Sequence, residues 1–163
     1  MPKVSTDRGA SVRVTVGLVT LALGANGCNR EAPAPATTVR VVLEDGAGSS
    51  SYDAVSQDPA CRPGLVGPGS WSVQFSDWKG PREGLRSLQL VIPQSADTGQ
   101  FYLGLVFGTL TDGVVYEIDT RQESSTHTGS GSVQIGEEAG GSTLTVVGQT
   151  DKGTKVTAVV RCR

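Results

Sequence analysis

Apolar and polar residues alternate along much of this 163-residue chain, and this pattern constrains its fold most. In the segment 71–76, for example, Trp71, Val73 and Phe75 alternate with serine and glutamine. A period of two is typical of a β-strand that buries one face. The same period recurs over 39–44, 87–92 and 101–107, and again beyond Leu144. Residues 39–163 contain no helical periodicity of useful length, which predicts an all-β domain.

Clusters of turn-forming residues separate these segments. The chain contains 22 glycines, and polar connections rich in Gly, Pro or Ser lie at 62–70, 77–84, 94–99 and 122–131. A sheet that is apolar on one face has to bury that face against another sheet. We therefore expect one β domain over residues 39–163, an antiparallel β-sandwich or a partly closed barrel of about seven to nine strands.

The segment from 46 to 61 carries the weakest strand signal. It is rich in Ser and Gly and low in hydrophobicity. Tyr52 and Val55 either belong to a short strand or only pack against the core.

Residues 112–113, Asp-Gly, lie between two apolar runs and predict a β-hairpin with a two-residue turn. In that register Thr111 lies opposite Val114, and Phe107 lies opposite Ile118. The apolar residues of both strands then share one face.

A second hairpin is predicted at residues 151–153, Asp-Lys-Gly, where Gly153 takes the left-handed conformation of a three-residue turn. This register places Val146 opposite Ala158. Cys162 then continues the inward face of the last strand.

The N-terminal segment 1–27 has the composition of a secretory signal helix. Lys3, Arg8 and Arg13 precede an uncharged apolar run from Val14 to Ala25. A run of this length is too short to span a bilayer, which takes about 20 apolar residues. A positive segment, a short apolar run and small residues before the processing point indicate export.

Cys28 follows this segment directly. The sequence Ala25-Asn26-Gly27-Cys28 resembles the lipobox of bacterial lipoproteins, which implies that Cys28 is diacylated and becomes the new N-terminus. Residues 28–38, with Pro33 and Pro35, would then form a semi-extended tether. The alternative is an ordinary signal peptide cut near Ala25, which leaves Cys28 as a free thiol.

The chain has three cysteines, an odd number for an exported protein. If Cys28 carries lipid, Cys61 and Cys162 remain as a pair in an oxidising compartment, where a disulfide is expected. Their Cα atoms should then lie roughly 4.4–6.8 Å apart. The alternative is two free, buried thiols.

Several of these features occur together in one known family. They are Cys28, the spacer, Cys61 before a strand, Gly-rich alternating strands and the closing sequence VTAVVRC that ends at Cys162. In this organisation the chain resembles the mycobacterial surface lipoprotein antigen family. The resemblance implies an envelope lipoprotein whose role is unassigned or host-recognised.

Motifs for catalysis and metal binding were tested one by one. His127 is the only histidine, and it lies in a Ser/Thr/Gly loop without neighbours that would orient a catalytic base. The tripeptide at 97–99, Asp-Thr-Gly, occurs in aspartic proteases, but a second copy is missing and the tripeptide also suits a turn. We expect no catalytic residue, no metal site and no cofactor.

Trp71, Trp78 and Tyr102 are the candidate ligand-binding residues. Tyr102 lies off the apolar face of its strand, and Trp78 lies off the face of Trp71. Exposed aromatic side chains mark binding surfaces. The alternative is that they cover a sheet end or a second core.

Removal of residues 1–27 takes away three of the 14 basic and one of the 16 acidic residues, which leaves a net charge of about −4. This balance argues against nucleic acid as a partner. The sequence favours a lipid-anchored cell-envelope lipoprotein on the extracytoplasmic side of a membrane, with a non-enzymatic domain that binds a protein or small ligand or has a structural role. The alternative is an envelope hydrolase that uses carboxylates in a cleft of the β domain.

Overall fold

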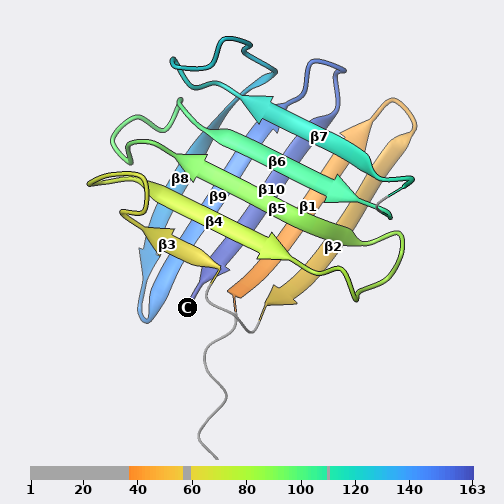
Figure 1. The fold of residues 1–163 in the computed structure, drawn as a ribbon, viewed down its shortest axis with the longest axis horizontal. Helices are drawn as coiled ribbons and strands as arrows, with labels where there is room; N and C mark the ends of the chain where they lie inside the picture. The colour runs from red at the N-terminus through yellow and green to blue at the C-terminus, as the bar shows by residue number, and fades with distance from the viewer. Residues whose placement is uncertain (1–36, 57–59, 110) are drawn as a thin grey trace, which may run out of the picture. The chain divides into compact units, whose positions relative to one another are not determined.

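The computed structural model describes residues 37–56, 60–109 and 111–163. These residues form ten β-strands in two antiparallel five-stranded sheets, which pack face to face as a β-sandwich (Figure 1). The predicted signal peptide, Cys28 and the tether up to residue 36 lie outside the described residues. Within the described part of the chain, no helix is long and apolar enough to cross a membrane.

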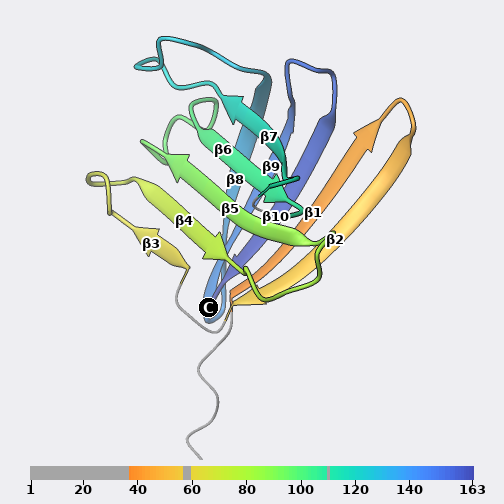
Figure 2. The same cartoon turned by 45° about the vertical axis from the view of Figure 1, so that its right-hand side comes forward.

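The two sheets differ in the part of the chain that supplies them. Sheet one contains, in spatial order, β2 (Gly48–Ser56), β1 (Thr37–Asp45), β10 (Lys155–Cys162), β9 (Gly141–Gln149) and β8 (Ser130–Glu138). Sheet two contains β3 (Cys61–Pro63), β4 (Trp71–Ser76), β5 (Leu85–Ile92), β6 (Tyr102–Phe107) and β7 (Val114–Asp119). In Figure 1 the strands of sheet two lie in front and cross those of sheet one, and Figure 2 separates the two layers.

The core lies between the sheets and is built from the alternating apolar residues. In β5, Leu88, Leu90 and Ile92 are fully buried, and in β1 Val39 and Val41 are buried in the same way. The burial pattern of most strands follows a period of two, as the sequence predicts. The expected all-β sandwich is therefore confirmed, and the two sheets do not close into a barrel. The ten strands of the described residues exceed the seven to nine expected.

Several strand boundaries differ from the prediction: β3 overlaps the predicted loop 62–70, and β8 begins at Ser130, inside the predicted loop 122–131. The segment 48–56 is a nine-residue strand that pairs with β1 along its whole length. It is the edge strand of sheet one, and its side chains are exposed up to Ser51. Only Tyr52, Ala54 and Ser56 are partly buried, so the alternation is too short to reveal the strand in the sequence. β1 begins at Thr37, inside the predicted tether, and Thr37 is buried.

The hairpin of β9 and β10 has the predicted register. Val146 lies opposite Ala158, and Leu144 lies opposite Val160. Gly153 has a φ of +88°, the left-handed conformation that the three-residue turn requires. The backbone N–H of Thr150 donates to the carbonyl oxygen of Thr154 at 2.9 Å.

The predicted register of the β6–β7 hairpin is wrong. Phe107 lies opposite Val114, and Ile118 lies opposite Leu103. A two-residue type I′ turn needs a positive φ at its first residue, whereas no described residue other than glycine has one. Instead the strands end at residues 107 and 114, and the N–H of Asp112 donates to Thr109 Oγ1 at 3.1 Å in a longer loop. The four-residue shift is even, so each side chain keeps its predicted face.

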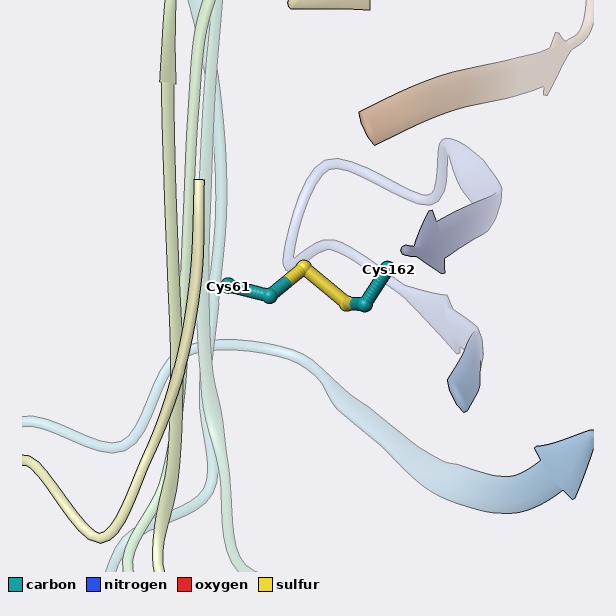
Figure 3. The surroundings of a disulfide bond; sticks show 2 residues. All are labelled: Cys61 and Cys162. Atoms are coloured by element: carbon teal, nitrogen blue, oxygen red, sulfur yellow. A yellow bond between two sulfur atoms is a disulfide. The ribbon is translucent and has the colours of Figure 1, made fainter. Parts of the chain in front are cut away.

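The disulfide between Cys61 and Cys162 joins the two sheets (Figure 3). Its Cα atoms lie 5.8 Å apart, within the predicted range, so the expected pairing is confirmed. Cys61 begins the short edge strand β3 of sheet two, and Cys162 ends β10 in the interior of sheet one. The bond therefore fixes the edge of one sheet against the middle of the other.

Candidate ligand-binding cleft

The three predicted aromatic residues do not form one surface. Trp71 begins β4 opposite the buried Ile92 and packs partly against the core. Tyr102 begins β6 opposite Val91, on the outer face of sheet two. Trp78 follows the other end of β4 and is 49% exposed. The three candidate residues therefore lie in three separate environments.

A cleft of about 720 Å³ lies at the end of sheet two where β4 and β6 begin. Three connections meet there, 64–70, 93–101 and 120–129, on the left side of Figure 1. Neighbouring strands are antiparallel, so β5 and β7 finish at the same end of sheet two at which β4 and β6 begin. The loops that follow β5 and β7 therefore lie at that end. The cleft is lined by Val66, Gly67, Pro68, Val91, Pro93, Gln94, Asp97, Gln100, Arg121, Gln122, Glu123 and Ser124.

One wall is the loop after β3, and internal hydrogen bonds hold its shape. The N–H of Gly64 donates to the carbonyl oxygen of Ser70 at 2.8 Å, which closes the loop. The buried Ser70 hydroxyl donates to the carbonyl oxygen of Gly67 at 2.7 Å and accepts from the N–H of Val66 at 3.2 Å. This wall presents Val66, which is 57% exposed, and Pro68 to the cleft.

The loop between β5 and β6 forms a second wall. Asp97 Oδ1 accepts from the N–H of Gly99 at 3.3 Å, so the Asp-Thr-Gly tripeptide forms a turn, as expected. Gln100 Nε2 donates to Asp97 Oδ2 at 2.7 Å. Gln100 Oε1 accepts from the N–H of Gln122 at 3.3 Å. Gln100 therefore links this loop to the loop that follows β7.

Arg121 is the best-fixed charged side chain of the cleft. Its Nε donates to Asp119 Oδ1 at 2.8 Å, and its Nη2 donates to Asp119 Oδ2 at 2.7 Å. The guanidinium carbon lies 4.9 Å from the centre of the Tyr102 ring, within the range of a cation–π contact. Nε and one hydrogen of Nη2 are thus committed to Asp119, while Nη1 has no hydrogen-bond partner among the described residues.

The hydrogen bonds from Arg121 lower the pKa of Asp119 to about 2, against the opposing effect of burial. The Asp119 side chain is only 7% exposed and that of Arg121 is 35% exposed. At neutral pH Asp119 is therefore an ionised partner of Arg121. A general acid needs a raised pKa instead.

Tyr102 supports the cleft through the contact of its ring with the Arg121 guanidinium. A Cβ atom at Gly104 would lie 2.7 Å from the Tyr102 hydroxyl oxygen, so the ring lies along its own strand over Gly104. Burial and the nearby Glu117 raise the pKa of Tyr102. Tyr102 therefore stacks under Arg121, although the sequence suggested a direct ligand contact.

Sequence reasoning missed Gln100 and Arg121. One feature of the sequence could have indicated Arg121: it follows Asp119 by two residues, at the end of a strand and before a polar loop. Gln100 carried no signal, because its partners Asp97 and Gln122 come from two different loops.

Arg86 was also missed, and it organises the opposite end of sheet two. It is 5% exposed, and its guanidinium binds backbone carbonyl oxygens. Nε donates to Gly108 at 2.6 Å and Nη1 donates to Gly80 at 2.8 Å. Arg86 thereby fixes the loop that carries Trp78.

Of the residues considered for catalysis, His127 is not part of the cleft lining, and Asp97 forms a turn. His127 is exposed in the loop before β8. In the described ranges no group of three His, Cys, Asp or Glu side chains lies close enough to hold a metal ion. No family model, curated protein or solved structure matches this chain.

Proposed function

We propose that this protein is a lipid-anchored envelope lipoprotein whose β-sandwich binds a ligand in the three-loop cleft without catalysing a reaction. The observation that carries the proposal is the disulfide between Cys61 and Cys162. It accounts for two of the three cysteines and leaves Cys28 with the lipobox-like sequence before it.

The disulfide supports export, because such bonds persist in oxidising compartments and are rare in the cytosol. The apolar run before Cys28 supplies a route out of the cytosol. Acylation of Cys28 would also remove the unpaired thiol from an oxidising space. The cysteine chemistry and the signal-like segment thus support the same location.

The tether would hold the sandwich close to the membrane. β1 begins at Thr37, so residues 28–36 lie between the proposed lipid and the domain. A Pro-containing segment of this length spans up to about 28 Å at ~3.1 Å per residue. The domain would therefore remain near the membrane surface.

The cleft supports binding more than hydrolysis. Its most strongly held carboxylate, Asp119, has a low pKa and is neutralised by Arg121. Asp97 accepts hydrogen bonds within its own turn. The general acid of a hydrolase requires a carboxyl group that stays protonated near neutral pH, and the lowered pKa of Asp119 is the opposite of that requirement.

The anchor is tested by mass spectrometry of the full chain expressed in a bacterial host. We predict that the mature N-terminal peptide starts at Cys28 and carries acyl mass. Cys28→Ala should abolish this mass and shift the protein from the detergent phase to the aqueous phase. Recovery of unmodified protein with an N-terminus near Asn26 would contradict the anchor and leave Cys28 as a free thiol.

A further inference from the structure

We infer that the cleft binds an uncharged saccharide. This inference rests on the ligand-binding role proposed above and names the class of ligand. It follows from the volume of the cleft, the mixture of apolar and polar residues that line it, its hydrogen-bonding groups and its charge.

The size and shape of the cleft suit a small ligand. Its volume of about 720 Å³ lies within the roughly 300–1,000 Å³ typical of such sites. The lining combines apolar side chains, those of Val66, Pro68, Val91 and Pro93, with polar ones. A sugar ring has the same mixed character, because its C–H groups form an apolar face while its hydroxyl groups project from the rim.

The polar residues of the lining offer both hydrogen-bond donors and hydrogen-bond acceptors. Gln94, Gln100 and Gln122 carry amides, each with an acceptor oxygen and a donor nitrogen. Arg121 adds the donors of Nη1, whereas the Ser124 hydroxyl already donates to the carbonyl oxygen of Thr126 at 2.9 Å. A hydroxyl group both donates and accepts, so neighbouring hydroxyls of a sugar match this mixture.

The charges of the cleft disfavour anions. Asp119 neutralises Arg121 through two hydrogen bonds, and Asp97 and Glu123 are the other charged groups in the lining and its support. The sum is negative, so phosphates, sulfated sugars and nucleic acids would be repelled. The same negative sum would attract a cationic peptide, although both Asp97 oxygens already accept hydrogen bonds, so a cationic peptide is the alternative occupant that the test has to distinguish.

The cleft is also organised before a ligand arrives. Gln100 links two of its loops, Arg121 is held between Asp119 and Tyr102, and Ser70 closes the third loop. A preorganised site loses less conformational entropy on binding. This matters for saccharides, whose many hydroxyl groups are well hydrated in water and leave only a small net gain per hydrogen bond.

The inference is tested by calorimetry and saturation-transfer NMR on the full chain in detergent. The probes are maltotriose, cellotriose, mannotriose, N,N′-diacetylchitobiose and, for comparison, hexalysine and inorganic phosphate. We expect saturable binding of at least one neutral saccharide, with transfer to its ring C–H protons. The exposed pair Gln94→Ala/Gln122→Ala should weaken that binding roughly tenfold or more, since it removes two hydrogen-bonding amides.

The matched control is Gln134→Ala, another exposed glutamine, which lies on β8 in the other sheet. It should leave saccharide affinity unchanged. The inference is overturned if none of the saccharides binds at concentrations up to about 10 mM, because weaker binding would not amount to a specific site. Equal binding by wild type and the Gln94/Gln122 double variant, or cleft-dependent binding of hexalysine alone, also overturns it. The last result would keep a binding function with a different ligand, whereas failure of the anchor would show only in the acylation experiment.

Discussion

At the scale of single residues, Asp119 and Arg121 connect the fold to the cleft. The N–H of Asp119 donates to the carbonyl oxygen of Thr128 at 2.7 Å, which ties the end of β7 to the loop that leads into β8. Its carboxylate holds Arg121 in two hydrogen bonds. The loss of Arg121 would leave the Asp119 carboxylate, which is 7% exposed, without its charged partner.

We predict that Asp119→Asn lowers the free energy of unfolding by about 2 kcal/mol at pH 7, from the displacement of its pKa from 3.8 to about 2. A folded-state pKa below the ordinary value contributes stability that is fully present above about pH 3.8. This contribution is lost as the pH falls through about 2. Urea unfolding at pH 7 and pH 2.5 should therefore show a difference between variant and wild type that shrinks in acid.

The control for this prediction is Asp53→Asn. Asp53 forms a longer ion pair with Arg40, at 3.9 Å, and both side chains are more than half exposed. Exposed pairs contribute little, so we expect almost no change at either pH. An Asp119→Asn defect of the same size at both pH values would mean that lost packing, and not the charge, is responsible.

At the scale of secondary-structure elements, two hairpins with similar turn signals have different outcomes. In β9–β10 the glycine of Asp151-Lys152-Gly153 has the predicted positive φ, and the register follows from it. In β6–β7 the Asp-Gly pair lies at the end of a longer loop stabilised by Thr109 and Asp112. Turn residues therefore specify register only where the loop length is also correct.

We predict that Gly153→Ala destabilises the protein by about 1 kcal/mol, because an L-residue is strained in the left-handed conformation. A Cβ atom at this position would have only Gln149 Nε2 within reach, at 3.8 Å, so the cost comes from the backbone and not from a clash. The matched control is Gly46→Ala, where φ is not positive and the space is open. It should be neutral in chemical unfolding, and equal effects of the two substitutions would contradict this account.

At the scale of the whole molecule, the disulfide fixes the relation between the two sheets. It joins residues 101 positions apart, from the short β3 to the last strand β10. β3 contains only three residues and pairs with a single neighbour, β4, so it has few hydrogen bonds of its own. The loop after β3 forms a wall of the cleft, and the bond therefore supports the cleft as well as the core.

We predict that Cys61→Ser together with Cys162→Ser lowers the free energy of unfolding by about 2–5 kcal/mol, because the unfolded chain loses a cross-link across a long loop. Chemical unfolding of wild type and double variant under oxidising conditions measures the effect. Both proteins should retain the β-sheet signal in circular dichroism. An unchanged midpoint would mean that packing between the sheets holds the sandwich closed without the bond.

Much of this fold could be predicted because its signals are local. The alternation of Leu88, Leu90 and Ile92 reports a buried face wherever the strand lies, and Gly153 reports its own turn. The pairing of Cys61 with Cys162 required no geometry, since few cysteines were available to pair. These features together predicted an all-β domain with a disulfide, and the structure decided for a sandwich over a partly closed barrel.

The tertiary structure alone decided the remaining features, because each depends on residues distant in sequence. The strand β2 exists through its pairing with β1, and the register of β6–β7 depends on how the loop between them closes. The cleft requires three loops that meet only when the strands of sheet two are side by side. Composition and periodicity describe each strand by itself, whereas the cleft is a property of their arrangement in space.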